Sequence, residues 1–107
     1  MEGSVVNKKP FATYHAEQRR LCILKSLSES QAKTANSSLL LMVLEQFGLV
    51  TTADQVASDL AWLAEQGLVT KRSVADTVIA TATKRGLSVA SGVVSHPGVA
   101  EPSPSGE

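Results

Sequence analysis

Few side chains in this 107-residue sequence have the types and spacing that bond-making chemistry requires. The two histidines, His15 and His96, lie near opposite ends of the chain, and neither has Cys, Asp or Glu at a metal-ligand spacing. The single cysteine, Cys22, has no base near it in the sequence, and one thiolate cannot build a metal-sensing cluster. No glycine-rich phosphate loop and no Gly-x-Ser-x-Gly nucleophile elbow occurs. We therefore expect a protein that is not an enzyme and has no cofactor and no metal site.

The segment from Thr51 to Gln66 holds side chains suited to binding. Three neutral side chains near its start could contact the base edges of DNA: Thr52, Gln55 and Ser58. A Gln amide pairs with adenine and a Ser hydroxyl with several bases. In the alternative interpretation, the segment is a capped and solvated helix that contacts nothing. It has no Lys or Arg but carries three carboxylates, which would meet phosphate unfavourably in a groove: Asp54, Asp59 and Glu65.

Four basic residues farther along the chain could contact DNA phosphates: Lys71, Arg72, Lys84 and Arg85. The first two lie where a hairpin is expected to turn, and the other two begin a short helix. Such contacts position a protein on a duplex, whereas the alternative is that these charges are only solvated. The formal net charge of the chain is +0, although a dedicated nucleic-acid binder usually has a basic excess. The charge pattern therefore favours weak electrostatic binding.

Apolar periodicity and turn residues predict three helices, a β-hairpin and a last helix. Ser, Thr or Asn stands at each of the expected second, third and last helix starts, and Gly follows their ends. Three helices followed by a two-stranded wing are typical of a winged helix-turn-helix, a mostly α fold with a small β-hairpin wing. The expected helices are 13–30, 37–47, 52–66 and 83–92, and the expected strands are 68–73 and 77–82.

The chain is long enough for one domain, which we expect over residues 13–92. A disordered leader over 1–12 and an extended or disordered Pro-rich tail over 93–107 are expected to flank it. The longest apolar run, Leu39–Leu44, is too short to cross a membrane, and no apolar signal region follows Lys8 and Lys9. We therefore expect a soluble, cytoplasmic protein.

The helical stripes predict which side chains face the core. The expected core positions are Leu21, Ile23, Leu24 and Leu27 in the first helix, Leu39, Leu40, Val43, Leu44 and Phe47 in the second, and Val56, Leu60 and Leu63 in the third. The expected solvent side of the first helix carries Glu17, Arg19, Arg20, Lys25 and Glu29, and that of the third includes Asp59 and Trp62.

Three large apolar side chains fall outside these stripes: Leu41, Met42 and Trp62. Apolar surface in excess of one core indicates a partner, most simply a second copy of the chain. For Trp62 the alternatives are packing against the wing and anchoring an interface. We expect a homodimer through the first two helices, with a phage or host protein as the other possible partner.

The stretch "LAWLAEQGLV", followed through the wing by "ATATKRGLSVASG" and then by "HPGVAEPSPS", resembles a family of small proteins of Mu-like bacteriophages and prophages. That family is described as ArsR-like winged-helix proteins, and the resemblance extends from about Arg19 to Ser105. It implies a phage or prophage gene product that acts in a bacterial host cell. The family's tail is basic between "PGV" and "PSP", whereas this chain has Ala100 and Glu101 there. A tail that holds phosphate is therefore not expected.

Two functions follow from these observations. The first is a phage or prophage transcription regulator that binds double-stranded DNA as a dimer, which the fold and the resemblance favour. The second is a winged-helix adaptor that binds a phage or host protein and no DNA, which the acidic third helix favours. Loss of basic residues would harm the first function, whereas apolar changes at Leu41, Met42 or Trp62 would harm the second.

Overall fold

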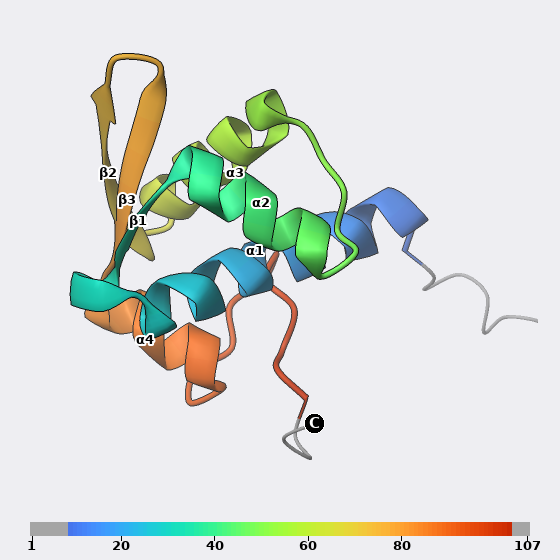
Figure 1. The fold of residues 1–107 in the computed structure, drawn as a ribbon. Coiled ribbons are helices and arrows are strands. Elements are labelled where there is room, and N and C mark those ends of the chain that lie inside the picture. Colours follow the sequence, from blue (N-terminus) through green and yellow to red (C-terminus); the bar gives the residue numbers. More distant parts are fainter. Residues whose placement is uncertain (1–8, 104–107) are drawn as a thin grey trace, which may run out of the picture.

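The computed structural model describes residues 9–103 as four α-helices and a three-stranded antiparallel sheet (Figure 1). The chain is thus α+β, and the order of its elements is consistent with a winged-helix-like arrangement. Residues 1–8 of the expected leader lie outside the described part. The first helix begins within the expected leader, at Phe11. The elements are α1 (Phe11–Glu29), a 3-10 turn (Gln31–Lys33), β1 (Thr34–Asn36), α2 (Ser37–Gln46), α3 (Ala53–Glu65), β2 (Val69–Val74), β3 (Thr77–Ala82) and α4 (Lys84–Ser91).

Side-chain caps set the starts of three helices, as the sequence predicts. The Asn36 side chain accepts the N–H of Leu39 at 2.8 Å before α2, and the Thr52 hydroxyl accepts the N–H of Gln55 at 3.1 Å in α3. Thr83 caps α4 in the same way. Each cap satisfies a backbone donor that has no partner within its own helix. Local signals therefore fix where these helices begin.

The sheet has a third strand that the sequence analysis does not predict. β1 pairs antiparallel with β3, which also pairs with β2, so the strand order is β1-β3-β2. Thr34 lies opposite Thr81, and their hydroxyl oxygens are 2.9 Å apart. A three-residue strand is too short to show alternation, and its partner lies far along the chain. The polar connection expected between α1 and α2 therefore extends the hairpin into a sheet.

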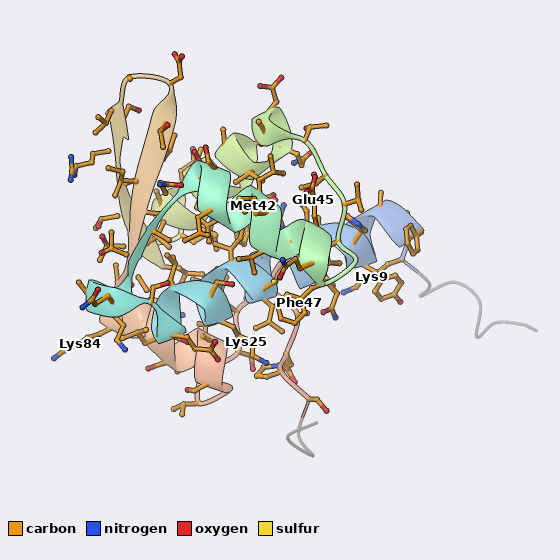
Figure 2. The ribbon with its side chains drawn as sticks, viewed as in Figure 1. Lys9, Lys25, Met42, Glu45, Phe47 and Lys84 are labelled. Atoms are coloured by element: carbon orange, nitrogen blue, oxygen red, sulfur yellow. The ribbon has the colours of Figure 1, made fainter. Side chains whose placement is uncertain are left out.

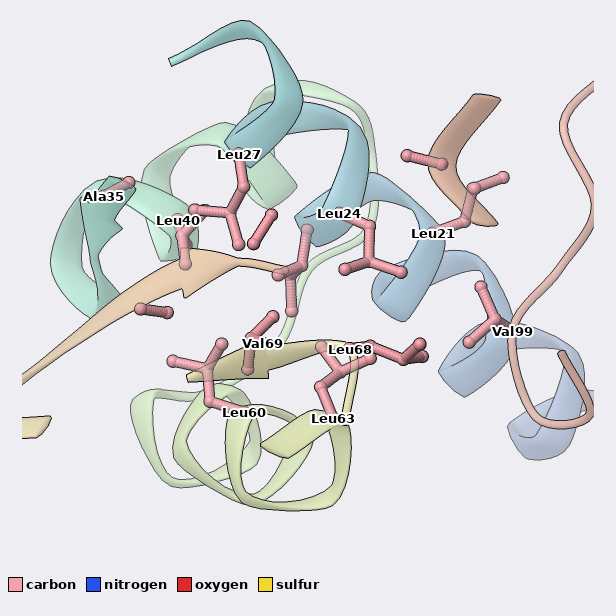
Figure 3. Packing of buried hydrophobic residues seen from close by; sticks show 14 of the residues in the cluster. Leu21, Leu24, Leu27, Ala35, Leu40, Leu60, Leu63, Leu68, Val69 and Val99 are labelled. Carbon is pink, nitrogen blue, oxygen red and sulfur yellow. The ribbon is translucent and has the colours of Figure 1, made fainter. Parts of the chain in front are cut away.

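The core lies between the sheet and helices α1, α2 and α3 (Figure 3). The stripes predicted for α1 and α3 are confirmed, with Leu24 and Leu60 fully buried. The stripe predicted for α2 is wrong at its edges, because Leu39 and Phe47 are 46% and 72% exposed whereas Leu41 packs against the core. Helix α2 is rotated relative to the expected orientation, and the Leu41 side chain packs within its own domain.

The described part of the tail, residues 93–103, contains no helix or strand, turns at Pro97–Gly98 and lies against α1 (Figure 1). Val99 is buried, and the backbone N–H of Ala100 donates to the carbonyl oxygen of Glu17 at 3.2 Å. This part of the tail is therefore packed on the domain. The prolines of the tail predict that it forms no regular helix or strand, but they do not predict where the tail docks.

Helix α4 docks closely at Gly86. A Cβ at this position would overlap the backbone carbonyl oxygen of Leu68 and lie 3.4 Å from the Leu24 side chain. The same Leu68 carbonyl accepts the backbone N–H of Thr83 at 3.0 Å. Glycine normally weakens a helix, but here it permits the approach that holds α4 against the start of β2.

We expect Gly86→Ala to lower the free energy of unfolding by about 3 kcal/mol, because the added methyl group has no space beside the Leu68 carbonyl. Urea denaturation followed by circular dichroism measures this change. Arg85→Ala, on the exposed side of the same helix, is the control and should stay within about 0.5 kcal/mol of the wild type. A Gly86→Ala variant of wild-type stability would contradict the close contact.

Candidate nucleic-acid interface

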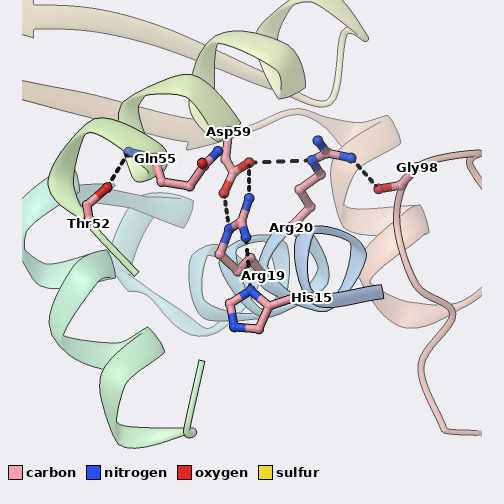
Figure 4. Close-up of polar contacts among 7 residues, drawn as sticks. All are labelled: His15, Arg19, Arg20, Thr52, Gln55, Asp59 and Gly98. Carbon is pink, nitrogen blue, oxygen red and sulfur yellow. Dashed lines mark hydrogen bonds and ion pairs between the residues drawn. The ribbon is translucent and has the colours of Figure 1, made fainter. Parts of the chain in front are cut away.

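The central carboxylate of α3, Asp59, is buried and paired with two arginines of α1 (Figure 4). Only 1% of Asp59 is exposed. Arg19 donates from Nε to Oδ2 at 2.6 Å and from Nη2 to Oδ1 at 3.1 Å, which is a bidentate pair. Arg20 Nε lies 3.5 Å from Oδ1. The expectation that Asp59, Arg19 and Arg20 face solvent is therefore wrong, since Arg19 is also buried and Arg20 is half-buried.

A partial signal for this burial is present in the sequence. With a step of about 100° per residue, Asp59 lies about 40° past Leu63, just outside the apolar stripe that Val56, Leu60 and Leu63 define on α3. Arg20 lies about 40° from Leu24, between apolar residues of α1 by the same measure. The sequence-based prediction assigns both side chains to solvent because they are charged, although Arg20 shares the apolar side of its helix and Asp59 borders that side of α3.

The pair extends through both arginines to other parts of the chain. Arg19 Nη1 lies 2.9 Å from Nδ1 of His15, and because a guanidinium only donates, this imidazole nitrogen accepts. Arg20 Nη1 donates to the carbonyl oxygen of Gly98 at 2.9 Å, which ties the tail to α1. Several polar atoms surround the buried carboxylate, and a paired charge of this kind is costly to disturb.

Trp62 of α3 lies between α1 and the tail. The Arg20 guanidinium carbon is 4.3 Å from its ring centre, a cation–π geometry, and His96 meets its ring edge-on at 5.9 Å. A Cβ at Gly98 would lie 2.7 Å from the ring, so the tail backbone runs directly against it. His96 Nε2 is 3.0 Å from Oε1 of Gln66, which adds a polar contact to the tail. Trp62 is thus engaged within its own chain, and this position differs from both a free interface anchor and packing against the wing.

The middle of the outer surface of α3 carries small, uncharged side chains. Asp54 is exposed in the first turn, where a carboxylate suits the positive helix end, and Glu65 is exposed in the last turn. Ser58 is exposed between them, whereas Gln55 is half-buried, and Figure 4 shows its side chain directed toward Asp59. One turn before Ser58 on the same face lies the exposed Asp54, and the small side chains beside Ser58 are Ala57 and, partly, Ala61.

The four basic residues of the hairpin and α4 are all exposed but do not form one group. Lys71 lies opposite the buried Ala80, and Arg72 lies opposite Ile79. Because successive strand residues point to opposite faces, Lys71 shares the face that packs on the helices, and Arg72 shares the other face.

Lys84 and Arg85 stand at the base of the hairpin, where α4 turns onto α1 (Figure 2). The start of β2, which follows α3, pairs with the end of β3, which precedes α4. This base is therefore at the C-terminal end of α3, and Thr52 lies at the other end, about 20 Å away along the helix. The structure places Lys71 on the side of the helices but separates Lys84 and Arg85 from the N-terminal half of α3.

The part of the chain that the structure describes has no group of three or more His, Cys, Asp or Glu that could hold a metal ion. Among the described helices, none is long and apolar enough to span a bilayer. The ion pair buried between α1 and α3 joins these two helices.

Comparison with known proteins relates the chain to a phage protein. No protein-family model matches the chain. The chain is 40% identical over 88 residues to the uncharacterized protein gp26 of Escherichia phage Mu, and the match covers 82% of this chain and 91% of gp26. The similarity therefore spans nearly the whole of both proteins and cannot be a shared local motif.

We expect Asp59→Asn to destabilise the protein by about 3 kcal/mol, because it leaves the buried Arg19 guanidinium without a counter-charge. Asp54→Asn, which removes an exposed carboxylate from the same helix, should cost less than about 1 kcal/mol. Urea titration of both variants measures the difference. Equal stabilities of the two variants would show that the buried pair does not hold α3.

Gly98→Ala should displace the tail, because its Cβ would press on Trp62 and its φ of 93° is strained for alanine. Trp62 is the only tryptophan, so a red shift of the fluorescence emission reports its exposure. Ser95→Ala, at an exposed position of the same tail, should leave the spectrum unchanged. An unshifted spectrum for Gly98→Ala would contradict the docking of the tail on Trp62.

Proposed function

The chain belongs to the family of Mu-like phage proteins that includes gp26 of phage Mu, and from this premise we propose that it is a DNA-binding regulator with a winged helix-turn-helix. Such a phage protein would act in the cytoplasm of the bacterial host. The winged-helix assignment is supported by the sheet order β1-β3-β2, by the short connection from α2 to α3, and by the β2–β3 hairpin beside α3. The ArsR-like resemblance of the sequence points to the same fold.

The observation that carries the proposal is the burial of Asp59. A carboxylate projecting from the middle of a recognition helix would be repelled by the phosphates that line a groove. In this chain Arg19 and Arg20 neutralise it inside the domain. The exposed middle of α3 is left with Ser58 beside Ala57 and Ala61, small side chains that allow the helix to approach base edges closely, and Asp54 lies one turn toward the N-terminus.

In the proposed complex, α3 enters the major groove and the wing reaches the flanking backbone. Ser58 contacts base edges, and Thr52 and Gln55 contribute at the N-terminal end, where the helix pole is positive. Lys71 binds phosphate beside α3, whereas Arg72 lies on the opposite face of β2 and contributes little, and contacts from Lys84 and Arg85 require the duplex to continue past the wing. About two to four phosphate contacts per subunit give a slope of log affinity against log salt of about −2 to −4 per subunit.

A second candidate function is that of a protein-binding adaptor that keeps the fold without binding DNA. It is favoured by the lack of any Lys or Arg in α3 and by the large apolar side chains exposed on α2, such as Met42 and Phe47. The partner would then be a phage or host protein. Binding to pooled random duplexes separates the two functions directly, because only the first requires it.

We expect Lys71→Ala to flatten the salt slope by about one, because it removes one phosphate contact on the side of the helices. Arg72→Ala, on the opposite face of the same strand, is the matched control and should change the slope by less than about half of that. Fluorescence anisotropy on labelled random duplexes across a salt series measures both. Wild-type protein that binds no duplex even at low salt would refute the DNA-binding function and leave the adaptor.

A further inference from the structure

A groove runs between α1 and α2 on the face shown in Figure 2. One end is a hollow of about 390 Å³ that includes Leu21, Cys22 and Leu49 in its lining. The other end is a hollow of about 240 Å³ that includes Leu40 and Val43. The two hollows share Ser26, Glu29 and Phe47, so they form one continuous depression with Phe47 at its centre.

Two large apolar side chains that line this groove are exposed: Leu39 of α2 at 46% and Phe47, directly after α2, at 72%. Met42 of α2 is 58% exposed but lines neither hollow. Leu39, Val43 and Phe47 follow one another at intervals of four residues, which places them along one edge of the helix toward α1. Large apolar side chains gathered beside an apolar depression are typical of a surface that is covered by a partner.

The charges around the groove indicate which partner fits. Figure 2 shows Lys25 of α1 and Glu45 of α2 on opposite flanks of Phe47, and Glu29 of α1 lines both hollows near Lys25, so the groove carries charges of both signs. A two-fold axis along the groove exchanges the flanks, so it would bring Lys25 of each copy toward Glu45 of the other. A strongly acidic or basic partner would instead oppose one of these two charges. The formal net charge of +0 adds no overall repulsion between two copies.

We propose that this groove is the interface of an isologous dimer, in which the two copies pack groove to groove and the Phe47 side chains of both copies meet at the centre. An isologous interface uses the same surface on both subunits, as the two-fold arrangement of Lys25, Phe47 and Glu45 requires. This surface belongs to the dimer expected from the sequence, but its central apolar side chain is Phe47, and Leu41 and Trp62 are not part of it. It does not rest on DNA binding, because a dimer and a DNA complex are measured separately.

Sedimentation of the full chain tests the proposal. The wild type should sediment at about twice the 11.2 kDa of the chain at tens of micromolar. Phe47→Ser should weaken the dimer at least tenfold, since it removes the central apolar side chain. Val93→Ser is the matched control, because Val93 is 78% exposed but does not line the groove, and it should leave the dimer unchanged.

Charge reversal tests the two-fold arrangement. Lys25→Glu alone should weaken the dimer several-fold, and adding Glu45→Lys should restore it, because the two reversed charges attract each other across the interface. Failure of the second change to restore the dimer would refute this arrangement. Circular dichroism confirms that each variant folds, so that weakened association is distinguished from unfolding.

The single cysteine provides a second readout that depends only on cover of the groove. Burial raises the pKa of the Cys22 thiol, so alkylation by a maleimide is expected to be slow and measurable. In the wild type its rate should fall further as protein concentration rises through the dimer range. In Phe47→Ser the rate should not depend on concentration. A monomeric wild type at tens of micromolar, with Cys22 alkylated at a constant rate, would overturn the proposal.

Discussion

The buried ion pair between Asp59 of α3 and Arg19 of α1 is the interaction on which the rest of the structure depends. Burying a carboxylate costs several kcal/mol unless it is paired, and the bidentate arginine meets this requirement only when α1 and α3 are in register. Apolar contacts between the same helices tolerate small shifts, whereas a two-bond charge pair does not. The pair therefore fixes the orientation of α3 more narrowly than the leucine core around it.

The same pair connects the domain to its tail and shapes the outer surface. Arg20 contacts Asp59, the Trp62 ring and the Gly98 carbonyl, so one side chain joins α1, α3 and the tail. Because the central carboxylate is withdrawn from the surface, the exposed middle of α3 is neutral. Asp54 and Glu65 remain exposed nearer the ends of that helix. The groove between α1 and α2 has no residue of α3 in its lining.

Local signals in the sequence predict the elements well, because caps at Asn36, Thr52 and Thr83 act within a few residues. The short strand β1 is not predictable, since its existence depends on pairing with a distant strand. The orientation of α2 is missed because its apolar residues cover too much of the helix to define one face. Asp59 borders the apolar stripe of α3, so its phase alone does not decide its burial, and its pairing with α1 depends on the tertiary structure. Docking of the tail likewise depends on contacts that the periodicity of apolar residues in the sequence does not reveal.

We propose that the middle of the α3 surface, which burial of Asp59 leaves uncharged, approaches the duplex. The most direct test is the duplex affinity of Ser58→Asp, which restores a carboxylate to the exposed middle of that helix without entering the core. At constant low salt the affinity should fall by about tenfold or more, with the circular dichroism spectrum and thermal melt unchanged. An affinity equal to that of the wild type would show that α3 does not face the DNA.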